Sequence, residues 1–158
     1  MNDFDFIIGE WTVLNKRLVN RLVESNEWVE FEADYKSWHV LNGFGNMDEM
    51  RVGEGPEEFC GLSMRIYNPE KKEWTIYWAD TENIANGINP QVKGSFNGKR
   101  GVFIGEELYK SKLMQLRFIW ESRSEDEAYW EQAYFDESKK EWETNWTMTF
   151  KRKKGKSL

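Results

Sequence analysis

The sequence has little of several residue types on which common protein chemistries depend. Its 158 residues include one cysteine, Cys60, one histidine, His39, and three prolines. A single cysteine excludes an internal disulfide and suits a reducing compartment. No apolar run approaches the roughly 20 residues that span a bilayer. The acidic N-terminal segment has only a two-residue aliphatic run at 7–8 and does not resemble a signal peptide. We therefore expect a cytoplasmic protein without membrane contact.

The scarcity of cysteine and histidine also limits the reactions that the chain can catalyse. No third member of a nucleophilic triad is evident beside Cys60 and His39. Cys60 shares a strand face with Leu62 and Met64, which is typical of a buried structural thiol, and His39 is expected at a strand end or surface. No cluster has the ligand spacing of a zinc site, and no glycine-rich phosphate loop precedes a helix. The sequence therefore predicts no catalytic residue, no metal and no cofactor.

Charge is distributed unevenly along the chain. The formal net charge is −6, but residues 151–158, KRKKGKSL, hold five Lys or Arg residues and no acidic residue. Residues 1–150 therefore carry 17 basic and 28 acidic side chains, and an acidic body repels phosphate backbones. We expect no nucleic acid partner, one domain at 1–150, and a solvated basic C-terminal tail at 151–158.

Tryptophan recurs at a spacing of four in two similar segments, KKEWTIYW at residues 71–78 and KKEWETNW at residues 139–146. Side chains four residues apart share a face in either a helix or a strand, so the context decides. Residues 75–77 are all β-forming, and residues 68–71 are typical of a turn with proline at its second position. The first segment is therefore predicted to lie in a β-hairpin, and the second has the same layout around a connection at 136–140.

The rest of the chain is also rich in strand-forming residues, and no segment of ten or more residues has helical periodicity. Turn-forming residues separate most of the predicted strands, which lie near residues 9–20, 28–37, 44–51, 59–67, 73–80, 91–97, 101–107, 113–121, 127–135 and 141–151. A meander of about ten antiparallel strands tends to curl and close, because closure removes its unpaired edges. We therefore predict an all-β fold, a single up-and-down antiparallel β-barrel of about ten strands that is wide enough for one small ligand.

The alternation of apolar and polar residues indicates which side chains face the interior of this barrel. In the strand near 28–37 the apolar set is Val29, Phe31, Ala33 and Tyr35. In the strand near 59–67 it is Leu62, Met64 and Ile66, and Trp74 and Trp78 join this side if the turn pairs Ile66 with Trp74. The last three strands place on one side Met114, Leu116, Phe118, Trp120, Ala128, Trp130, Gln132, Tyr134, Trp142, Thr144, Trp146 and Met148.

The opposite faces of the last strands carry a second row of side chains, Arg117, Glu131 and Asn145, which can bond to one another across the strands. In one interpretation, the tryptophans face the interior and this row is an exposed ionic ladder. In the other, the row lines a polar cavity with Arg65 and Tyr77, and the tryptophans face outward into an oligomer contact. We favour the first, because burying one large apolar side chain is worth about 2–3 kcal/mol and ligand cavities are mostly apolar.

The segment FDFIIGEW contains Gly9 and Trp11 in a Gly-x-Trp arrangement that is similar to the signature of lipocalin-like (calycin) barrels. The resemblance implies that Trp11 plugs the closed end of the barrel and that a basic residue after the final strand, Lys151 or Arg152, covers it. Together with GFGNMDEMR, LSMRIYNP, WTIYWAD, RFIWE and WEQAYFDESKKEWETNW, this segment resembles a family of uncharacterised cytosolic bacterial lipocalin-like proteins over nearly the whole chain. The resemblance implies the barrel and no established substrate or catalytic residue.

These patterns predict a binding module for a small apolar or aromatic molecule. Indole faces supply dispersion and stacking, and a few polar groups orient the polar end of a ligand. In the segment NMDEM, Asn46 and Asp48 share a face that points into the barrel if Phe31 aligns with Met50. The predicted ligand-binding residues are Asn46, Asp48, Trp78, Trp120, Trp130, Gln132, Thr144 and Trp146.

Two other classes of function stay open. One is a cofactor-independent lyase or isomerase, in which Asp48, or Arg117 with Glu131, provides acid and base groups inside the barrel, assisted by Tyr77 or Tyr134. A hydrogen-bonded core carboxylate and a strand-to-strand ion pair are the simpler explanations of the same residues. The other class is a protein-interaction barrel with aromatic residues in an outer patch, which predicts a homodimer or a larger assembly.

Overall fold

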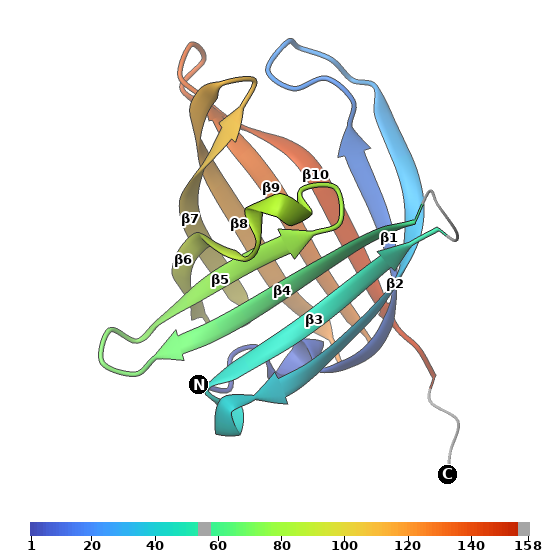
Figure 1. Ribbon diagram of the computed structural model, residues 1–158, viewed down its shortest axis with the longest axis vertical. Helices are drawn as coiled ribbons and strands as arrows, with labels where there is room; N and C mark the ends of the chain where they lie inside the picture. Colours follow the sequence, from blue (N-terminus) through green and yellow to red (C-terminus); the bar gives the residue numbers. More distant parts are fainter. Residues whose placement is uncertain (54–57, 155–158) are drawn as a thin grey trace.

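The protein forms a closed barrel of ten antiparallel strands in a computed structural model that describes residues 1–53 and 58–154 (Figure 1). The strands are β1 (Gly9–Leu18), β2 (Trp28–Val40), β3 (Gly45–Val52), β4 (Phe59–Asn68), β5 (Glu73–Asp80), β6 (Asn89–Asn97), β7 (Arg100–Tyr109), β8 (Lys112–Ser124), β9 (Glu127–Asp136) and β10 (Glu141–Arg152). Short 3-10 helices lie at η1 (Asp5–Ile7), η2 (Leu41–Gly43) and η4 (Ile84–Asn86). Each strand pairs with its neighbours in sequence, and β1 also pairs with β10, which confirms the predicted up-and-down barrel.

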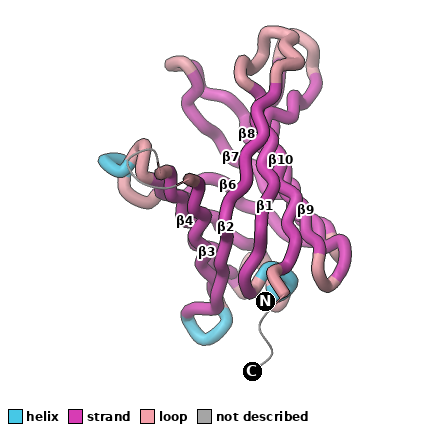
Figure 2. The backbone as a smooth tube through the Cα atoms, turned by 90° about the vertical axis from the view of Figure 1, so that its right-hand side faces the viewer, coloured by secondary structure: helices cyan, strands magenta, loops and turns pink. Residues whose placement is uncertain are grey.

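The connections alternate between the two ends of the barrel, because consecutive strands are antiparallel neighbours. Figure 2 shows loops above the strands and a helical turn below β2 and β3. We call one end, where the β1–β2, β7–β8 and β9–β10 connections lie, the open end, and the other, where η1 and η2 lie, the closed end. β10 reaches the closed end at Arg152, two residues beyond the domain boundary expected at residue 150, and pairs there with Trp11 of β1. Residues 155–158 of the expected basic tail lie outside the described residues.

Trp11 and Arg152 together close one end of the barrel. Trp11 is fully buried and donates its indole N–H to the carbonyl of Ile7 at 2.9 Å. The guanidinium carbon of Arg152 lies 4.2 Å from the centre of the Trp11 ring, and its nitrogens donate to the carbonyls of Phe6 and Ile8. Of the two basic residues that the resemblance to lipocalin-like barrels offered for this position, Arg152 therefore holds it.

A cluster of aromatic rings fills the barrel above this plug. Phe4, which precedes η1, is buried with its ring centre 5.0 Å from that of Trp74, 4.8 Å from that of Phe96 and 5.9 Å from that of Trp120. All three contacts are edge-to-face, a geometry worth roughly 0.5–1.5 kcal/mol per pair beyond the burial of the rings. The N-terminal segment therefore packs as part of the core and supports the floor of the barrel interior.

The β4–β5 hairpin differs from the predicted register by one residue. Tyr67 pairs with Trp74, whereas the sequence led us to expect Ile66 in that place. The cause is the turn, in which Lys72 adopts a left-handed φ of 54° and adds one residue to the connection. The tryptophans of β5 still face inward, but the residues of β4 that face outward are Leu62, Met64 and Ile66, and those that face inward are Gly61, Ser63, Arg65 and Tyr67.

A β-bulge in β10 separates the two tryptophans of the second KKEW segment. The pairing with β9 is continuous up to Thr144 and resumes at Trp146, so Asn145 is an extra residue without a partner. Trp146 faces the interior as predicted, whereas Trp142 and Thr144 face outward. The expectation that all three share the inner face is wrong, because alternation of faces holds only while the pairing is continuous.

Trp120, Trp130 and Trp146 face the interior of the barrel, which agrees with the first of the two interpretations. Arg117 and Glu131 lie on the outer face, where they form an ion pair at 3.6 Å and are both half-buried. Tyr77 also faces outward on β5, between inward-facing neighbours. Arg65 and Asn145 are the exceptions to the expected outer set, because the structure buries both inside the barrel.

Candidate functional site

A cavity of about 180 Å³ extends from the middle of the barrel toward its open end. Of the predicted ligand-binding residues, those that line it are Asp48, Trp78, Trp120, Trp130, Gln132 and Trp146. Asn46 is buried and also points inward, but it contacts Arg65 beside the cavity. Thr144 lies on the outer face of β10, where its hydroxyl donates to Glu131 at 3.1 Å. Its expected place in the cavity wall is therefore wrong.

Trp130 of β9 lies in the middle of an aromatic wall. Its ring centre is 5.0 Å from that of Phe118 and 5.8 Å from that of Trp146, both at steep interplanar angles. It is also the direct cross-strand partner of Trp120. The indole N–H of Trp146 donates to Asn15 at 2.9 Å, which fixes the orientation of that ring. Ring contacts and this hydrogen bond therefore position the indoles of the wall side by side.

Trp78 of β5 forms the wall on the other side of the barrel. Its N–H donates to the carboxylate of Asp80 at 2.7 Å. Its six-membered ring lies directly over Gly61 of β4, and a Cβ atom at that position would overlap with the ring. The absence of a side chain at Gly61 therefore allows Trp78 to lie flat against the barrel wall and leaves the space in front of it open.

A buried polar cluster forms the floor of the cavity. Arg65 is only 1% exposed, and its guanidinium group donates to Asp48, to Asn46 and to the hydroxyl of Tyr35. The Tyr35 hydroxyl in turn donates to Asp48, which also accepts the backbone N–H of Ser63 at 3.0 Å. These contacts neutralise the Arg65 charge inside the barrel, as a buried ion pair requires.

Burial also sets the protonation of this cluster. It raises the pKa of Tyr35 well above its ordinary value of 10.0, an effect that Arg65 opposes and Asp48 reinforces. For Arg65, burial alone would lower the pKa, but Tyr35 and Asp48 outweigh it and the net direction is upward. The floor therefore presents a neutral phenol and a permanent cation, and the ring faces of Phe4 and Trp120 lie 5.0 and 5.1 Å from the Arg65 guanidinium carbon.

An amide cluster lies behind the aromatic wall, where β9, β10 and β1 meet. Gln132 donates to the side-chain oxygen of Asn145 at 2.9 Å. Asn145 and Asn15 are both fully buried, and among the described residues neither side-chain nitrogen has a hydrogen-bond acceptor. The bulge thus adds polar groups to an otherwise aromatic part of the interior.

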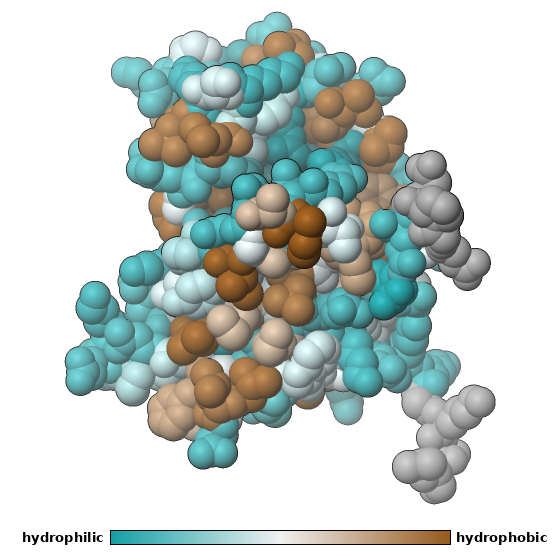
Figure 3. Space-filling view, viewed as in Figure 1, coloured by the Kyte–Doolittle hydropathy of each residue, from teal (hydrophilic) through white to brown (hydrophobic). Residues whose placement is uncertain are grey.

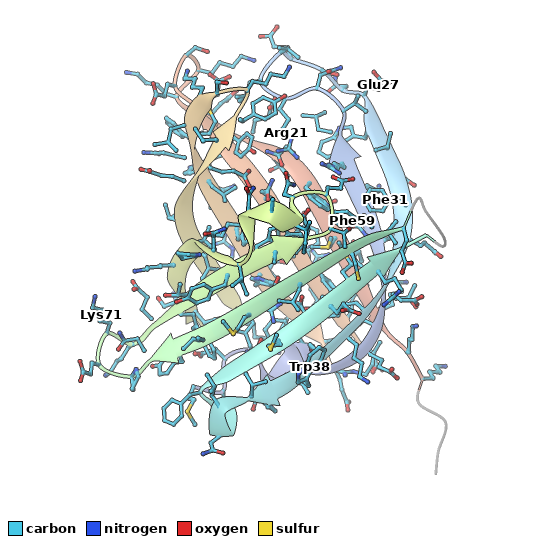
Figure 4. All side chains as sticks on the ribbon, in the orientation of Figure 1. Arg21, Glu27, Phe31, Trp38, Phe59 and Lys71 are labelled. Atoms are coloured by element: carbon cyan, nitrogen blue, oxygen red, sulfur yellow. The ribbon has the colours of Figure 1, made fainter. Side chains whose placement is uncertain are left out.

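Two arginines lie at the mouth of the cavity, and Figure 4 labels Arg21 below the β1–β2 connection at the open end. The guanidinium carbon of Arg17 lies 4.7 Å from the centre of the Trp146 ring. Arg21 donates to the hydroxyl of Tyr134 at 2.9 Å, and that hydroxyl donates to Glu107. Burial raises the pKa of Tyr134, and Glu107 adds to the rise, so this phenol stays neutral.

The β1–β2 connection lies across the mouth and is tied to the β9–β10 hairpin. The backbone N–H of Leu22 donates to the Glu143 carboxylate at 2.7 Å, and Glu24 forms an ion pair with Lys139 at 2.8 Å. Leu22 also packs against the core. These contacts hold Arg21 in its place above the cavity.

Several residues singled out in the sequence lie away from the cavity. Cys60, expected to be buried on the inner face, is half-buried on the outer face of β4, because the face that it shares with Leu62 and Met64 is the outer one. His39 is exposed near the end of β2, as expected, 3.5 Å from Asp5. Within residues 1–53 and 58–154 no three His, Cys, Asp or Glu side chains gather as metal ligands, and no helix is long and apolar enough to cross a bilayer.

Arg17 and Arg21 were not predicted as cavity residues, and only the second interpretation placed Arg65 in a cavity. The favoured interpretation placed Arg65 on the outer face, because it lies opposite the apolar set Leu62, Met64 and Ile66 of its strand, and these three residues in fact face outward. Arg17 could have been found, because it alternates in phase with Trp11, which the Gly-x-Trp resemblance places inside. Arg21 follows the end of β1, where alternation gives no information.

No protein-family model matches the sequence, and no curated protein matches it. Among solved structures, the S-type phycobiliprotein lyase CPES from Guillardia theta is similar, with a TM-score of 0.62. The two chains are 11% identical over 97% of this chain and 92% of that one. At this identity the likeness establishes the fold alone. The protein is therefore an all-β protein whose fold is a closed up-and-down barrel of ten antiparallel strands with an aromatic-walled interior.

Proposed function

We propose that the barrel binds a small aromatic molecule in the cavity between Trp78, Trp130 and Trp146. The observation that carries the proposal is an inner space of about 180 Å³ whose walls are indole rings from four different strands. Flat π-surfaces on opposite sides of a cavity favour a flat apolar ligand, which gains dispersion and stacking on both faces. Asp48 and Gln132 provide polar groups at the edge of the same space.

The volume of the cavity supports a ligand of one or two rings. An apolar cavity of about 150 Å³ in another protein is large enough to accept benzene. The space here is slightly larger, and loop residues such as Glu82 and Asn83 also line it. That a barrel of the same fold is a phycobiliprotein lyase is consistent with a small-molecule partner.

A titration with small aromatic compounds tests this function. Binding should quench tryptophan emission and raise the melting temperature. The Trp130→Leu variant should bind about tenfold more weakly, which corresponds to about 1.4 kcal/mol. Trp142→Leu is the matched control, because the same indole is removed from the outer face of β10. A library that produces neither quenching nor a thermal shift would reject the proposal, as would equal losses in the two variants.

A lyase or isomerase is supported less well. Asp48 lines the cavity, but its carboxylate accepts from Arg65, Tyr35 and the Ser63 N–H, which occupy the lone pairs that a general base would use. The alternative pair, Arg117 and Glu131, lies on the outer face and cannot reach a ligand in the barrel. Loss of turnover with retained ligand affinity in Asp48→Asn would favour the enzyme.

A second candidate role is self-association through the outer face of β2 to β5. Trp38, Met47, Met64 and Tyr77 are successive cross-strand partners that form one outward-facing row. Figure 3 shows hydrophobic side chains over β3 to β5 on this face. The outer aromatic patch expected for a protein-interaction barrel is not formed by the indoles of the cavity, which face inward. A homodimer stays a prediction, with this row as its contact.

Three further expectations also stay predictions. They are a cytoplasmic location, the absence of a nucleic acid partner, and membership of the narrower family of bacterial lipocalin-like proteins.

A further inference from the structure

Arg17 and Arg21 line the cavity mouth without a carboxylate partner among the described residues. No Asp or Glu oxygen within residues 1–53 and 58–154 lies within 4.0 Å of either guanidinium group. Both side chains are half-buried and have therefore lost part of their hydration. We propose that the ligand is an aromatic carboxylate whose ring lies between the tryptophans and whose charged group binds Arg17 and Arg21. The inference rests on the proposed function of the cavity.

Arg17 is positioned to be the main contact for the anion. Its guanidinium carbon lies over the ring of Trp146, 4.7 Å from the ring centre. A guanidinium group over an aromatic ring gains a cation–π contact and carries five N–H donors, which can also bind an anion. Trp146 is itself held by its bond to Asn15. A fixed fork of donors beside an aromatic wall matches a planar carboxylate attached to a ring, because both parts of the ligand then bind at once.

Arg21 is the weaker of the two contacts. It donates to the Tyr134 hydroxyl at 2.9 Å, and Tyr134 donates to Glu107. Glu107 therefore offsets part of the Arg21 charge through the intervening phenol. The β1–β2 connection that carries Arg21 is tied down by the Leu22 to Glu143 bond, which places this second cation over the cavity mouth.

Acidic residues on the other side of the mouth orient the charged group. Asp80 and Glu82 follow the end of β5 and line the cavity opposite β1. Asp80 already accepts the N–H of Trp78 and two bonds from Asn83. An anion is repelled by this side and attracted by the arginine side, whereas a cationic ligand would prefer the reverse placement. The charge of the ligand thus decides between two opposed orientations.

The experiment compares ligands of one shape and three charges, namely cinnamate, cinnamamide and cinnamylammonium, by calorimetry. Cinnamate should bind the wild-type protein about tenfold more tightly than cinnamamide, and also more tightly than cinnamylammonium. In Arg17→Gln the advantage of cinnamate should fall to about twofold, with an intermediate value in Arg21→Gln. Lys16→Gln is the matched control, because Lys16 neighbours Arg17 but pairs with Glu30 on the outer face at 3.5 Å, and it should keep the full advantage.

Other outcomes overturn the inference. Equal binding of cinnamate and cinnamamide to the wild-type protein, tightest binding of cinnamylammonium, or a full cinnamate advantage in Arg17→Gln would each show that the arginines do not select an anion. In these cases cinnamamide still binds, and the proposed function stands without this inference. If none of the three ligands binds, the proposed function fails and the inference fails with it.

Discussion

Arg152 lies over the ring of Trp11, and the two residues are direct partners across the seam between β10 and β1. The same guanidinium group donates to the carbonyls of Phe6, Ile8 and Glu125. One side chain at the end of the last strand therefore joins the N-terminal segment, the first strand and the β8–β9 turn. The contact covers one end of the barrel at a point where chain segments far apart in sequence meet.

Replacing Arg152 by alanine should lower the free energy of unfolding by about 2–4 kcal/mol, because the cation–π contact and several hydrogen bonds to carbonyls are lost together. Urea denaturation followed by tryptophan emission measures the change. Lys151→Ala is the control, because the exposed Lys151 should contribute less than about 0.5 kcal/mol. Similar losses in the two variants would contradict the role of Arg152.

Adding a methyl group at Gly61 should disturb the cavity wall. The new Cβ of Gly61→Ala would overlap with the six-membered ring of Trp78, which must rotate and weaken its bond to Asp80. We expect a loss of about 1–3 kcal/mol in stability and a shift in tryptophan emission. In a Trp78→Phe background, where the ring is shorter, the same change should have a smaller effect. Strictly additive effects would show that the two residues do not interact.

Folding stability should fall at alkaline pH through Tyr35. Burial raises the pKa of this phenol well above 10.0 in the folded state, whereas in the unfolded chain it ionises near pH 10. The stability that neutral Tyr35 contributes is therefore complete below about pH 10 and is lost above it, by up to about 1.4 kcal/mol per pH unit. Urea denaturation between about pH 9 and pH 11 should show a shallower decline in Tyr35→Phe than in the wild-type protein. An unchanged slope would contradict this assignment.

A charge on the outer row should prevent self-association. Met64 lies between its cross-strand partners Met47 and Tyr77 on the outer face of the sheet. If this face joins two copies, Met64→Glu should raise the dimer dissociation constant at least about 100-fold, because the carboxylate would be buried against apolar groups. Sedimentation of both proteins over a range of concentrations measures it. A wild-type protein that stays monomeric at every concentration would contradict the predicted homodimer.

The fold could be predicted from the sequence because its signals are local and repeated. Alternation over most strands gave the correct inner faces. Examples are Ala33 and Tyr35 in β2, and Met114, Leu116, Phe118 and Trp120 in β8. The faces of Asn46 and Asp48 were also correct, although Met50 pairs with Tyr35 and not with Phe31. The predicted partner of Met50 was wrong by four residues. An even shift leaves each side chain on the same face of the strand, so this error did not change which residues face the cavity.

The errors arose in two strands, β4 and β10. In β4 the apolar residues Leu62, Met64 and Ile66 face outward, and the turn with the left-handed Lys72 shifts the pairing with β5 by one residue, so Arg65 lies in the core beside the inward-facing tryptophans. In β10 the bulge at Asn145 places Thr144 on the outer face. Lysine is not a residue typical of a left-handed φ, and Asn145, although asparagine is uncommon in strands, does not by itself show that the strand has a bulge there. Arg21 at the mouth could not be predicted for a different reason. Arg21 is placed by contacts of the β1–β2 connection with a distant hairpin, and such contacts leave no periodic pattern in the sequence.

The bulge also affects how related sequences should be aligned. Removing one residue from the middle of a strand normally turns every later side chain to the opposite surface. Deleting Asn145 would instead restore an unbroken ladder and leave Trp142 outside and Trp146 inside, because the flanking pairs already continue in phase around it. A homologue with a gap at this position would thus keep the same indoles around the same hollow, and the length difference would be a neutral insertion rather than evidence of another architecture.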